Sequence, residues 1–257
     1  MTISGRGLTG GRVGVLHIHS DYSRDGHDTL EELHAWAVDR GIDFIAMTDH
    51  AEDFVPELFD EYVAHCASLS DDRVTIIAGL EFRFAGYTGL HLLALGLTEW
   101  IQPTTPAEFA EQASRAARFT IVAHPVLASY KVPAEVRAKI DAVEIWNASY
   151  NTRYLPDPRA IDVLREIRAS RPEVFGTAGL DQHDRTNDRR TRVFTGPTND
   201  PLGELKAGRF TSAGQTMRFD APVAMSSARF GALKLVRWAF DRVERTQERM
   251  SRAFARG

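Results

Sequence analysis

The stretch Leu16-His-Ile-His-Ser-Asp-Tyr-Ser-Arg-Asp-Gly26 lies near the amino terminus and follows a mostly apolar run that begins at Val13. We expect residues 13–16 to form a buried strand, with His17 and His19 at its end. Alternate side chains of a strand share a face, so both imidazoles are expected to point the same way and bind one ion. Asp25 precedes Gly26, where a turn can bring a carboxylate to the same place. A His-x-His pair alone is a weak signal, so the rest of the chain decides.

Length and composition describe an ordinary globular protein. The chain has 257 residues, 43% hydrophobic and 26% charged, a size at which α/β barrels form one domain. Its net charge of −4 argues against a general nucleic-acid-binding surface. Cys66 is the single cysteine, which excludes a disulfide framework and a thiolate metal site. Without a secretion signal or an apolar run of about 18 residues, we expect a cytoplasmic protein with no membrane contact.

Apolar periodicity predicts alternating strands and helices. Asp28 is expected to cap the first helix and Gly41 to end it. Alternation at this rhythm implies a mostly parallel sheet, and the number of units favours a closed barrel. Residues 184–222 are expected to be loops with a short helix at 202–207, and 226–254 a final helix. The expected strands are 13–16, 43–48, 74–78, 90–97, 119–123, 142–146 and 174–180, and the expected helices are 29–40, 54–69, 106–118, 132–139 and 158–170.

The final helix has a basic bias. We expect its apolar residues Phe230, Leu233, Trp238 and Phe240 to pack on the barrel while the charges face water. A contact with nucleic acid or a membrane is the less favoured alternative. The whole chain, 1–257, is therefore interpreted as one domain with a core at about 13–220 and a helical extension at 221–257.

Histidines gather at the ends of the expected strands. Six of the nine lie there, with three carboxylates, and the carboxyl ends of barrel strands converge on one mouth. His91 is the exception, because it precedes most of its strand, which must then be antiparallel or short. The nine residues of this set are His17, His19, Asp25, His50, Glu81, His91, His124, Asp181 and His183.

These donors suit divalent metal ions. Imidazole and carboxylate ligands without sulfur are typical of Zn²⁺, Mn²⁺ or Fe²⁺ sites. Nine ligands are too many for one ion and can hold two or three if a carboxylate bridges. Neighbouring cations lower the pKa of a bridging water and neutralise phosphoryl oxygens, which is the chemistry of phosphoester hydrolysis at neutral pH.

The ordered set of motifs resembles the polymerase-and-histidinol-phosphatase (PHP) superfamily. The resemblance covers roughly residues 13–220. The motifs are His17-x-His19 with Ser23-x-Asp25-Gly26, Thr48-Asp-His50, Gly79-Leu-Glu81, Gly89-Leu-His91, Ala123-His-Pro125, Gly179-Leu-Asp-Gln-His183 and Leu205-Lys-Ala-Gly-Arg-Phe210. Gln182 departs from the pattern, because the family commonly has a small residue there, and it is expected to narrow the pocket.

The resemblance implies a distorted (β/α)7 barrel with a site for three divalent ions. All nine expected positions hold competent ligands. One ion is then implied at His17, His19, Glu81 and Asp181. The second is implied at Glu81, as the bridge, with His91 and His124, and the third at Asp25, His50 and His183.

Several further residues are candidates for contact with the substrate. Asp181 is a candidate to transfer a proton from the attacking water as well as to bind metal. Asn147, at the end of an expected strand, and the arginines Arg153 and Arg185 are the predicted substrate contacts. Lesser candidates are His27, the arginines Arg83, Arg189, Arg190 and Arg192, and the aromatic residues Trp146, Tyr150 and Tyr154.

We therefore predict a metal-dependent phosphoesterase in which a metal-bridging hydroxide attacks a small phosphomonoester. An open mouth would also admit an oligonucleotide end, so a 5′–3′ exonuclease or nucleotide phosphatase is the first alternative. The same metals could hydrolyse an amide or a cyclic ester. A noncatalytic assembly domain is the last alternative, and the complete ligand set counts against it. Metal identity, oligomeric state and substrate are not determined at this level.

Overall fold

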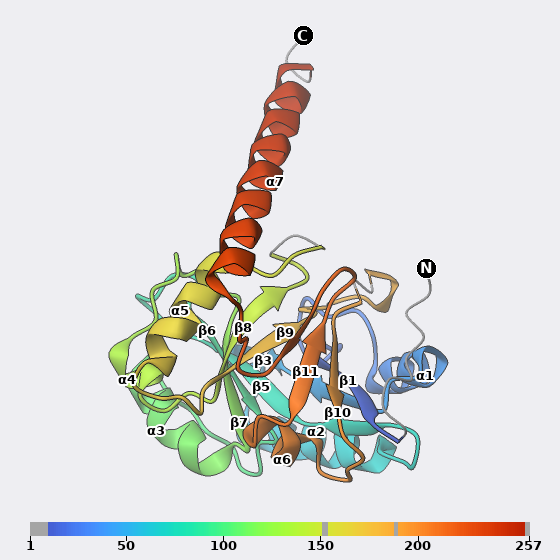
Figure 1. The fold of residues 1–257 in the computed structure, drawn as a ribbon. Coiled ribbons are helices and arrows are strands. Elements are labelled where there is room, and N and C mark those ends of the chain that lie inside the picture. Colours follow the sequence, from blue (N-terminus) through green and yellow to red (C-terminus); the bar gives the residue numbers. More distant parts are fainter. Residues whose placement is uncertain (1–9, 151–153, 188–189, 255–257) are drawn as a thin grey trace. The chain divides into compact units, whose positions relative to one another are not determined.

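The computed structural model describes residues 10–150, 154–187 and 190–254, and the side chains as far as Val243 (Figure 1). The chain divides into two compact units, Met1–Val223 and Ala224–Gly257, which are described separately. The first unit holds all strands and the first six α-helices. These helices are α1 (Leu30–Arg40), α2 (Pro56–Leu69), α3 (Pro106–Ala116), α4 (Ala134–Arg137), α5 (Pro158–Arg168) and α6 (Pro201–Lys206), with 3₁₀ turns at η1 (Ala51–Asp53) and η2 (Arg185–Asn187).

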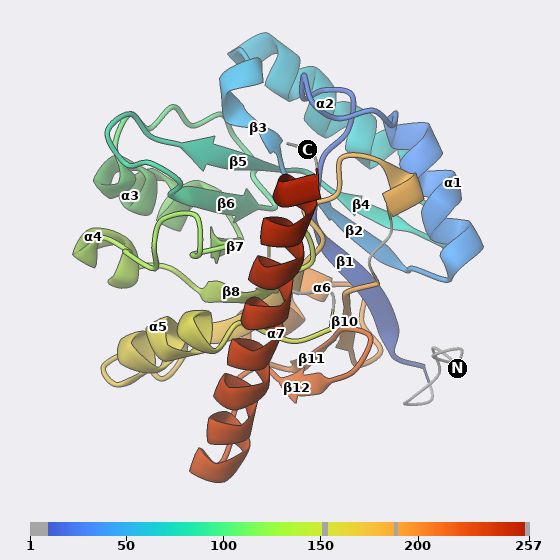
Figure 2. The same ribbon diagram turned by 90° about the horizontal axis from the view of Figure 1, so that it is seen from above.

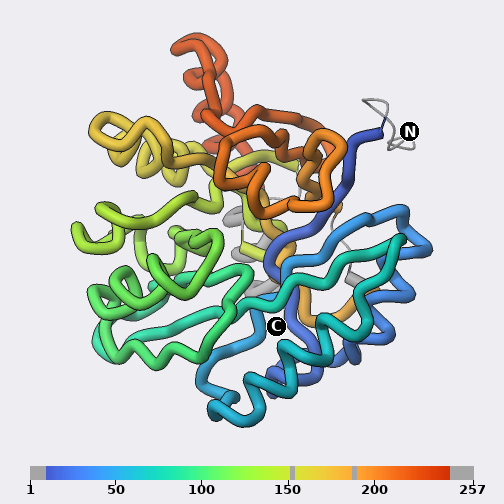
Figure 3. The backbone as a smooth tube through the Cα atoms, turned by 90° about the horizontal axis from the view of Figure 1, so that it is seen from below, coloured from blue at the N-terminus to red at the C-terminus, as the bar shows by residue number. Residues whose placement is uncertain are grey.

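The first sheet has the order β12-β11-β10-β1-β2-β4. Its strands β1, β2 and β4 are parallel, whereas β10, β11 and β12 add antiparallel pairs beside β1. Figure 3 shows the blue β1 between the orange β10–β12 segment and β2. The strands are β1 (Arg12–Ile18), β2 (Phe44–Met47), β4 (Thr75–Ile77), β10 (Arg192–Thr195), β11 (Phe210–Ala213) and β12 (Arg218–Asp220).

The second sheet has the order β3-β5-β6-β7-β8-β9. Here β6 is antiparallel to both of its neighbours, and the other pairs are parallel. The position of His91 predicted that its strand is either antiparallel or short, and the direction of β6 confirms that it is antiparallel. The strands are β3 (Asp49–His50), β5 (Gly79–Arg83), β6 (His91–Leu95), β7 (Phe119–Ala123), β8 (Ala142–Asn147) and β9 (Phe175–Gly179).

The chain and its hydrogen bonds join the two sheets at both sides. Strand β2 continues into β3 after Thr48, and β4 continues into β5 after Ala78. On the other side the end of β9 bonds to the end of β1, because Leu180 N–H donates to Leu16 O (3.0 Å) and Asp181 N–H donates to His17 O (2.7 Å). The strands therefore follow one another around a ring with seven positions. This arrangement agrees with the expected α/β fold of distorted barrel type.

Helices cover the outside of this ring, and apolar side chains fill one end of its interior. Figure 2 shows α1 and α2 on the side of β2 and β4, and α3, α4 and α5 on the side of β6–β8. The buried cluster inside combines β1, β2, β6 and β7 with Leu202 and Leu205 of α6 and Phe210 of β11. Burial of this apolar surface supplies the main stabilisation and leaves the opposite end of the ring for polar residues.

Several local predictions need correction. The sheets are mixed rather than mostly parallel, because β6 and the β10–β12 segment run against their neighbours. Residues 184–222 contain three strands, where loops with one short helix were expected. Thr29, rather than Asp28, caps α1: its hydroxyl accepts from Glu32 N–H, and the Glu32 carboxylate accepts from Thr29 N–H. Gly41 ends α1 at φ 64° as predicted.

The second unit consists chiefly of α7 (Ser227–Phe254), close to the helix predicted at 226–254. Leu235, Val236, Trp238 and Val243 are all exposed along it. Within the described part of the chain, no helix combines the length and apolar character needed to cross a bilayer.

Candidate metal centre

All nine predicted ligands meet at the end of the ring opposite the apolar filling. His17, His50, His124 and Asp181 lie at or just beyond the carboxyl ends of strands, where the fold brings them together. His91 begins β6, and the antiparallel direction of that strand puts its first residue at the same end. The register pairs His50 with Glu81 across β3 and β5. Strand direction thus explains the apparent exception in the sequence.

The deeper part of the cluster, called here the inner half, consists of His17, His19, Glu81, His124 and Asp181, each at most 5% exposed. Two imidazole nitrogens, Nε2 of His17 and Nε2 of His19, each lie 3.5 Å from Asp181 Oδ1. Glu81 Oε1 lies 3.6 Å from His17 Nε2 and 3.2 Å from His124 Nε2. His91, the ninth residue of the cluster, adjoins the inner half, with its Nδ1 2.8 Å from Glu81 Oε1, so the Glu81 carboxylate has the central position expected of a bridge.

The outer half of the cluster consists of the buried His50 and of Asp25 and His183, which are more open to solvent. Asp25 Oδ2 lies 3.2 Å from His50 Nε2 and 3.4 Å from His183 Nε2. The side chain of Asp25 is 53% exposed and that of His183 is 30% exposed. His50 Nδ1 lies 3.2 Å from Glu81 Oε2, which connects the two halves.

The donor atoms fit divalent cations. Among the described residues, Nε2 of His17, both ring nitrogens of His19 and Nδ1 of His124 are buried without a hydrogen-bond partner. Such groups are costly unless something binds them, and imidazole nitrogens facing carboxylates at 3.5–3.6 Å leave room for a shared ion. Three overlapping sets have ligand atoms within 4.8 Å of one another: His19, Asp25, His50 and His183; His17, Glu81 and His124; and His17, His19 and Asp181.

The pKa shifts of the inner half show that its carboxylates favour a bound positive charge. Burial by itself would lower the pKa of His17, but the carboxylates of Asp181, Glu144 and Glu81 raise it well above 6.5. Burial would raise the pKa of Glu81, but the charge of His17 and hydrogen bonds from neighbouring imidazoles hold it well below its usual value. Protons and metal ions thus compete for the same buried positions.

The comparisons with known proteins agree with this geometry. Residues 16–132 match the PHP domain family. Over this stretch the chain is similar to PHP domains. Seven of the nine cluster residues lie inside the match, and Asp181 and His183 follow it. A Bifidobacterium adolescentis protein, named as an unproven metal-dependent phosphoesterase, has a crystal structure that aligns with 68% of this chain and 89% of its own, at 15% identity and a TM-score of 0.50. That likeness concerns the fold alone. No curated protein matches the chain.

The backbone is unusual at three of the predicted ligands. His17, His124 and Asp181 have φ values of 66°, 21° and 51°, in the region that non-glycine residues rarely adopt. The pairing of β1 with β2 shifts between Leu16 and Ile18, so His17 is a bulge residue. The expected reason for the alignment of His17 with His19, simple alternation along a strand, is therefore wrong, although their rings do approach each other, with centroids 5.4 Å apart.

Glu144 supports the inner half and was missed from the sequence. The Nδ1–H of His17 donates to Glu144 Oε1 (3.0 Å), which leaves Nε2 facing the cluster. Glu144 Oε2 accepts from His124 N–H and from the Asn147 amide, both at 2.8 Å. A Cβ at Gly179 would lie 1.7 Å from Glu144 Oε1, so only glycine leaves space for this carboxylate. An acidic residue inside the apolar strand of Val-Glu-Ile-Trp-Asn was the available signal.

Asp49 provides a second buried support, below the loop that carries Asp25. Its Oδ1 accepts from Ser20 N–H (2.7 Å) and from the Ser23 hydroxyl (2.8 Å). The Ser23 oxygen in turn accepts from His50 N–H (2.8 Å). These bonds connect the turn after β1 to β3, and so fix the two segments that bear the outer half.

The predicted substrate contacts have different surroundings. Asn147 is buried, and besides Glu144 its amide faces Asp181 Oδ2 at 3.5 Å. Arg153 lies outside the described residues. Arg185 forms ion pairs with Asp28 and with Glu32 (2.9 Å to Glu32 Oε1), and would have to leave them to reach a substrate.

Arg83, a lesser candidate from the sequence, directly contacts the cluster. Its Nη2 lies 2.7 Å from Nε2 and 3.1 Å from Nδ1 of His50. Its Nη1 lies 3.3 Å from Glu52, and both side chains of that pair are about 40% exposed. Strand alternation places Arg83 two residues after Glu81 on the same side of β5. A guanidinium at the rim of a metal cluster is suited to an anionic oxygen.

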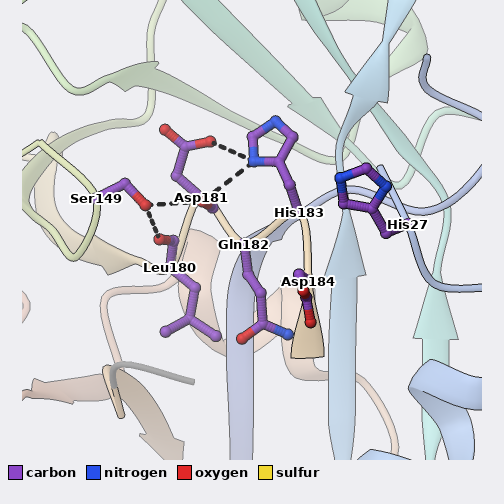
Figure 4. A pocket seen from close by; sticks show the side chains of 7 residues that line it. All are labelled: His27, Ser149, Leu180, Asp181, Gln182, His183 and Asp184. Atoms are coloured by element: carbon purple, nitrogen blue, oxygen red, sulfur yellow. Dashed lines mark hydrogen bonds and ion pairs between the residues drawn. The ribbon is translucent and has the colours of Figure 1, made fainter. Parts of the chain in front are cut away.

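A pocket of about 280 Å³ adjoins Asp181 and His183. Figure 4 shows these two side chains on one side of the chain and Gln182 on the other, with His27 and Ser149 flanking the pocket. The Gln182 amide is buried and has no hydrogen-bond partner within the described part of the chain. Gln182 thus lines the pocket.

The aromatic candidates separate into buried and exposed residues. Trp146 is fully buried and fills space beside Gly214, so it is a core residue. Tyr150 is 45% exposed, and its ring centroid lies 4.8 Å from that of His124. Tyr150 therefore offers an aromatic face next to the inner half.

Proposed function

We propose that this chain is a phosphoesterase that hydrolyses a small phosphomonoester with three divalent ions of Zn, Mn or Fe. The observation that carries the proposal is the set of three overlapping ligand groups with buried imidazole nitrogens facing carboxylates. When bound, the cations supply an activated water and neutralise the phosphoryl oxygens.

The protein side chains would have distinct tasks in this reaction. Glu144 holds His17 in the orientation that exposes Nε2, and Glu81 connects the inner and outer halves. Asp181 lies beside His17 and His19, where it can accept a proton from the attacking water. Asn147 donates to Glu144 and faces Asp181, so it orients both carboxylates. Because its side chain is buried, it would contact a substrate only if the substrate enters the cluster.

Arg83 is the residue that we expect to bind a nonbridging phosphate oxygen. It already contacts His50, and its partner Glu52 is solvent-exposed, so the pair is weak and an incoming anion can compete with it. Arg185 and Arg153 stay predictions as further phosphate contacts. Tyr150 would face the leaving group, and this exposed ring favours a nucleotide as the second candidate substrate.

The test combines metal analysis with a phosphoester panel. Purified protein would be analysed for Zn, Mn and Fe and assayed on p-nitrophenyl phosphate, histidinol phosphate, nucleotides and short RNA. His17→Ala and Glu81→Ala should lose bound metal and turnover with the fold retained in circular dichroism. His65→Ala is the matched control, because His65 pairs with Glu31 outside the cluster. Metal-loaded protein without phosphoesterase activity on any substrate would refute the proposal.

Arg83 has its own experiment. Arg83→Ala should raise KM for a dianionic monoester more than for a monoanionic diester, and should weaken inhibition by inorganic phosphate, while the metal content stays unchanged. Arg83→Lys should restore part of the loss, because it returns the charge without the bidentate fork. Arg73→Ala, which removes a guanidinium paired with Asp71, is the control. Equal kinetics for wild type and Arg83→Ala would exclude the assigned contact.

A further inference from the structure

Helix α7 presents apolar residues at a regular spacing that the metal centre does not explain. Val236, Phe240 and Val243 are 43%, 36% and 55% exposed and follow one another at intervals of four and three residues. The sequence continues the same intervals through Gln247, Met250 and Phe254. Apolar residues repeated every 3.5 positions on average form the contact line of a coiled coil.

The residues beside this line suit a close partner helix. The position before each alternate member of the line holds a small residue, which lets two backbones approach. These positions are Ala239, Thr246 and Ala253, before Phe240, Gln247 and Phe254. On the opposite flank the sequence has Arg237 and, one heptad later, Glu244, whose charges would attract across an antiparallel pair.

We propose that α7 pairs in antiparallel fashion with α7 of a second copy of this chain, through the line that includes Val236, Phe240 and Val243. In an antiparallel pair each side of the contact line meets the same side of the other helix. The small residues would then face small residues, and Arg237 would face Glu244 of the second copy. The line extends from Val236 to Phe254, which is 19 residues, about 28 Å or nearly three heptads of contact. A polar residue at one core position, Gln247 in the sequence, is also typical of coiled coils that set their register.

A lipid surface or a nucleic acid fits the pattern less well. The helix carries charges of both signs, and Arg237 Nε at the flank of the line pairs with Asp241 Oδ1 at 2.9 Å. Trp238, the aromatic residue that would suit a membrane interface, stacks with Arg242 away from the 3.5-residue line.

The test measures the mass of the full chain in solution by light scattering and sedimentation velocity. Wild type should have twice the 28.7 kDa mass of one chain, and Val236→Asp/Val243→Asp should have the mass of one chain. The matched control is Leu235→Asp, which removes a 65% exposed apolar side chain outside the line and should leave the dimer intact. Circular dichroism and thermal unfolding would establish that each variant folds.

A charge exchange tests the orientation of the pair. Glu244→Arg should weaken the dimer by juxtaposing like charges, and Arg237→Glu/Glu244→Arg should restore it. A monomeric wild type, equal dissociation in Leu235→Asp, or α7-dependent binding to anionic vesicles or RNA by a monomer would each overturn the proposal. None of these readouts depends on phosphoesterase activity.

Discussion

The two halves of the metal cluster are built differently. The inner half lies on or at the ends of strands, is almost completely buried, and is fixed from behind by Glu144. The outer half combines His50 with loop residues Asp25 and His183, two side chains that are 53% and 30% exposed. From this difference we expect the inner half to determine whether metal binds at all. We expect the outer half to change its side-chain positions with the ion and substrate that are bound.

The largest effect is expected from Glu81, which joins the halves. Glu81→Gln should reduce turnover by more than about 10³-fold, because both neighbouring ions lose a charged ligand. This reduction is larger than the one expected from removing a single hydrogen-bond donor that stabilises the transition state. Elemental analysis should show a loss of more than one metal equivalent. Retention of full metal content would mean that Glu81 is not the bridge.

Asp25→Asn should affect the outer half alone. We expect a loss of about 100-fold in kcat/KM and of one metal equivalent, because Asp25 belongs to only one of the three ligand groups, that of His19, Asp25, His50 and His183. Titration of metal into protein treated with a chelator would count the remaining sites. If all metal is lost, the two halves do not bind metal independently of each other.

Glu144→Gln tests the support behind the inner half. The amide can still contact His17 but no longer provides charge, so metal affinity should fall about 10-fold. Competition with a chromogenic chelator measures this change, with Glu166→Gln as the control for an exposed carboxylate paired with Arg137. An unchanged affinity would show that Glu144 acts only through packing.

The smallest effect is a pH dependence of stabilisation by metal. The carboxylates outweigh burial and raise the pKa of His17 above 6.5, so this interaction stabilises the metal-free fold below about pH 6.5 and is lost as the pH rises through the folded pKa. Metal requires the deprotonated imidazole. The increase in Tm on adding Mn²⁺ should therefore be larger at about pH 8 than at about pH 6. A constant shift would indicate that His17 is neutral throughout.

Much of the fold could be predicted because its apolar patterns are local. The β7 strand was predicted with its observed bounds, and α1, α2, α5 and α7 to within a few residues. The three strands from Arg192 onward were missed because the stretch is polar and arginine-rich, and their pairing with one another and with β1 is decided by tertiary contacts. Asp28 resembled a helix cap, but Arg185, distant in sequence, pairs with it.

The sequence alone determined which donors are available, and the motifs that carry them predicted the nine residues of the cluster and the PHP resemblance. Only the tertiary structure decided that β6 is antiparallel, that His17 occupies a bulge, that Glu144 stands behind the inner half and that Arg83 contacts His50. The physical reason is that residue type and periodicity are encoded locally, whereas strand direction, backbone strain and the pairing of buried charges depend on segments that meet only when the ring of strands forms.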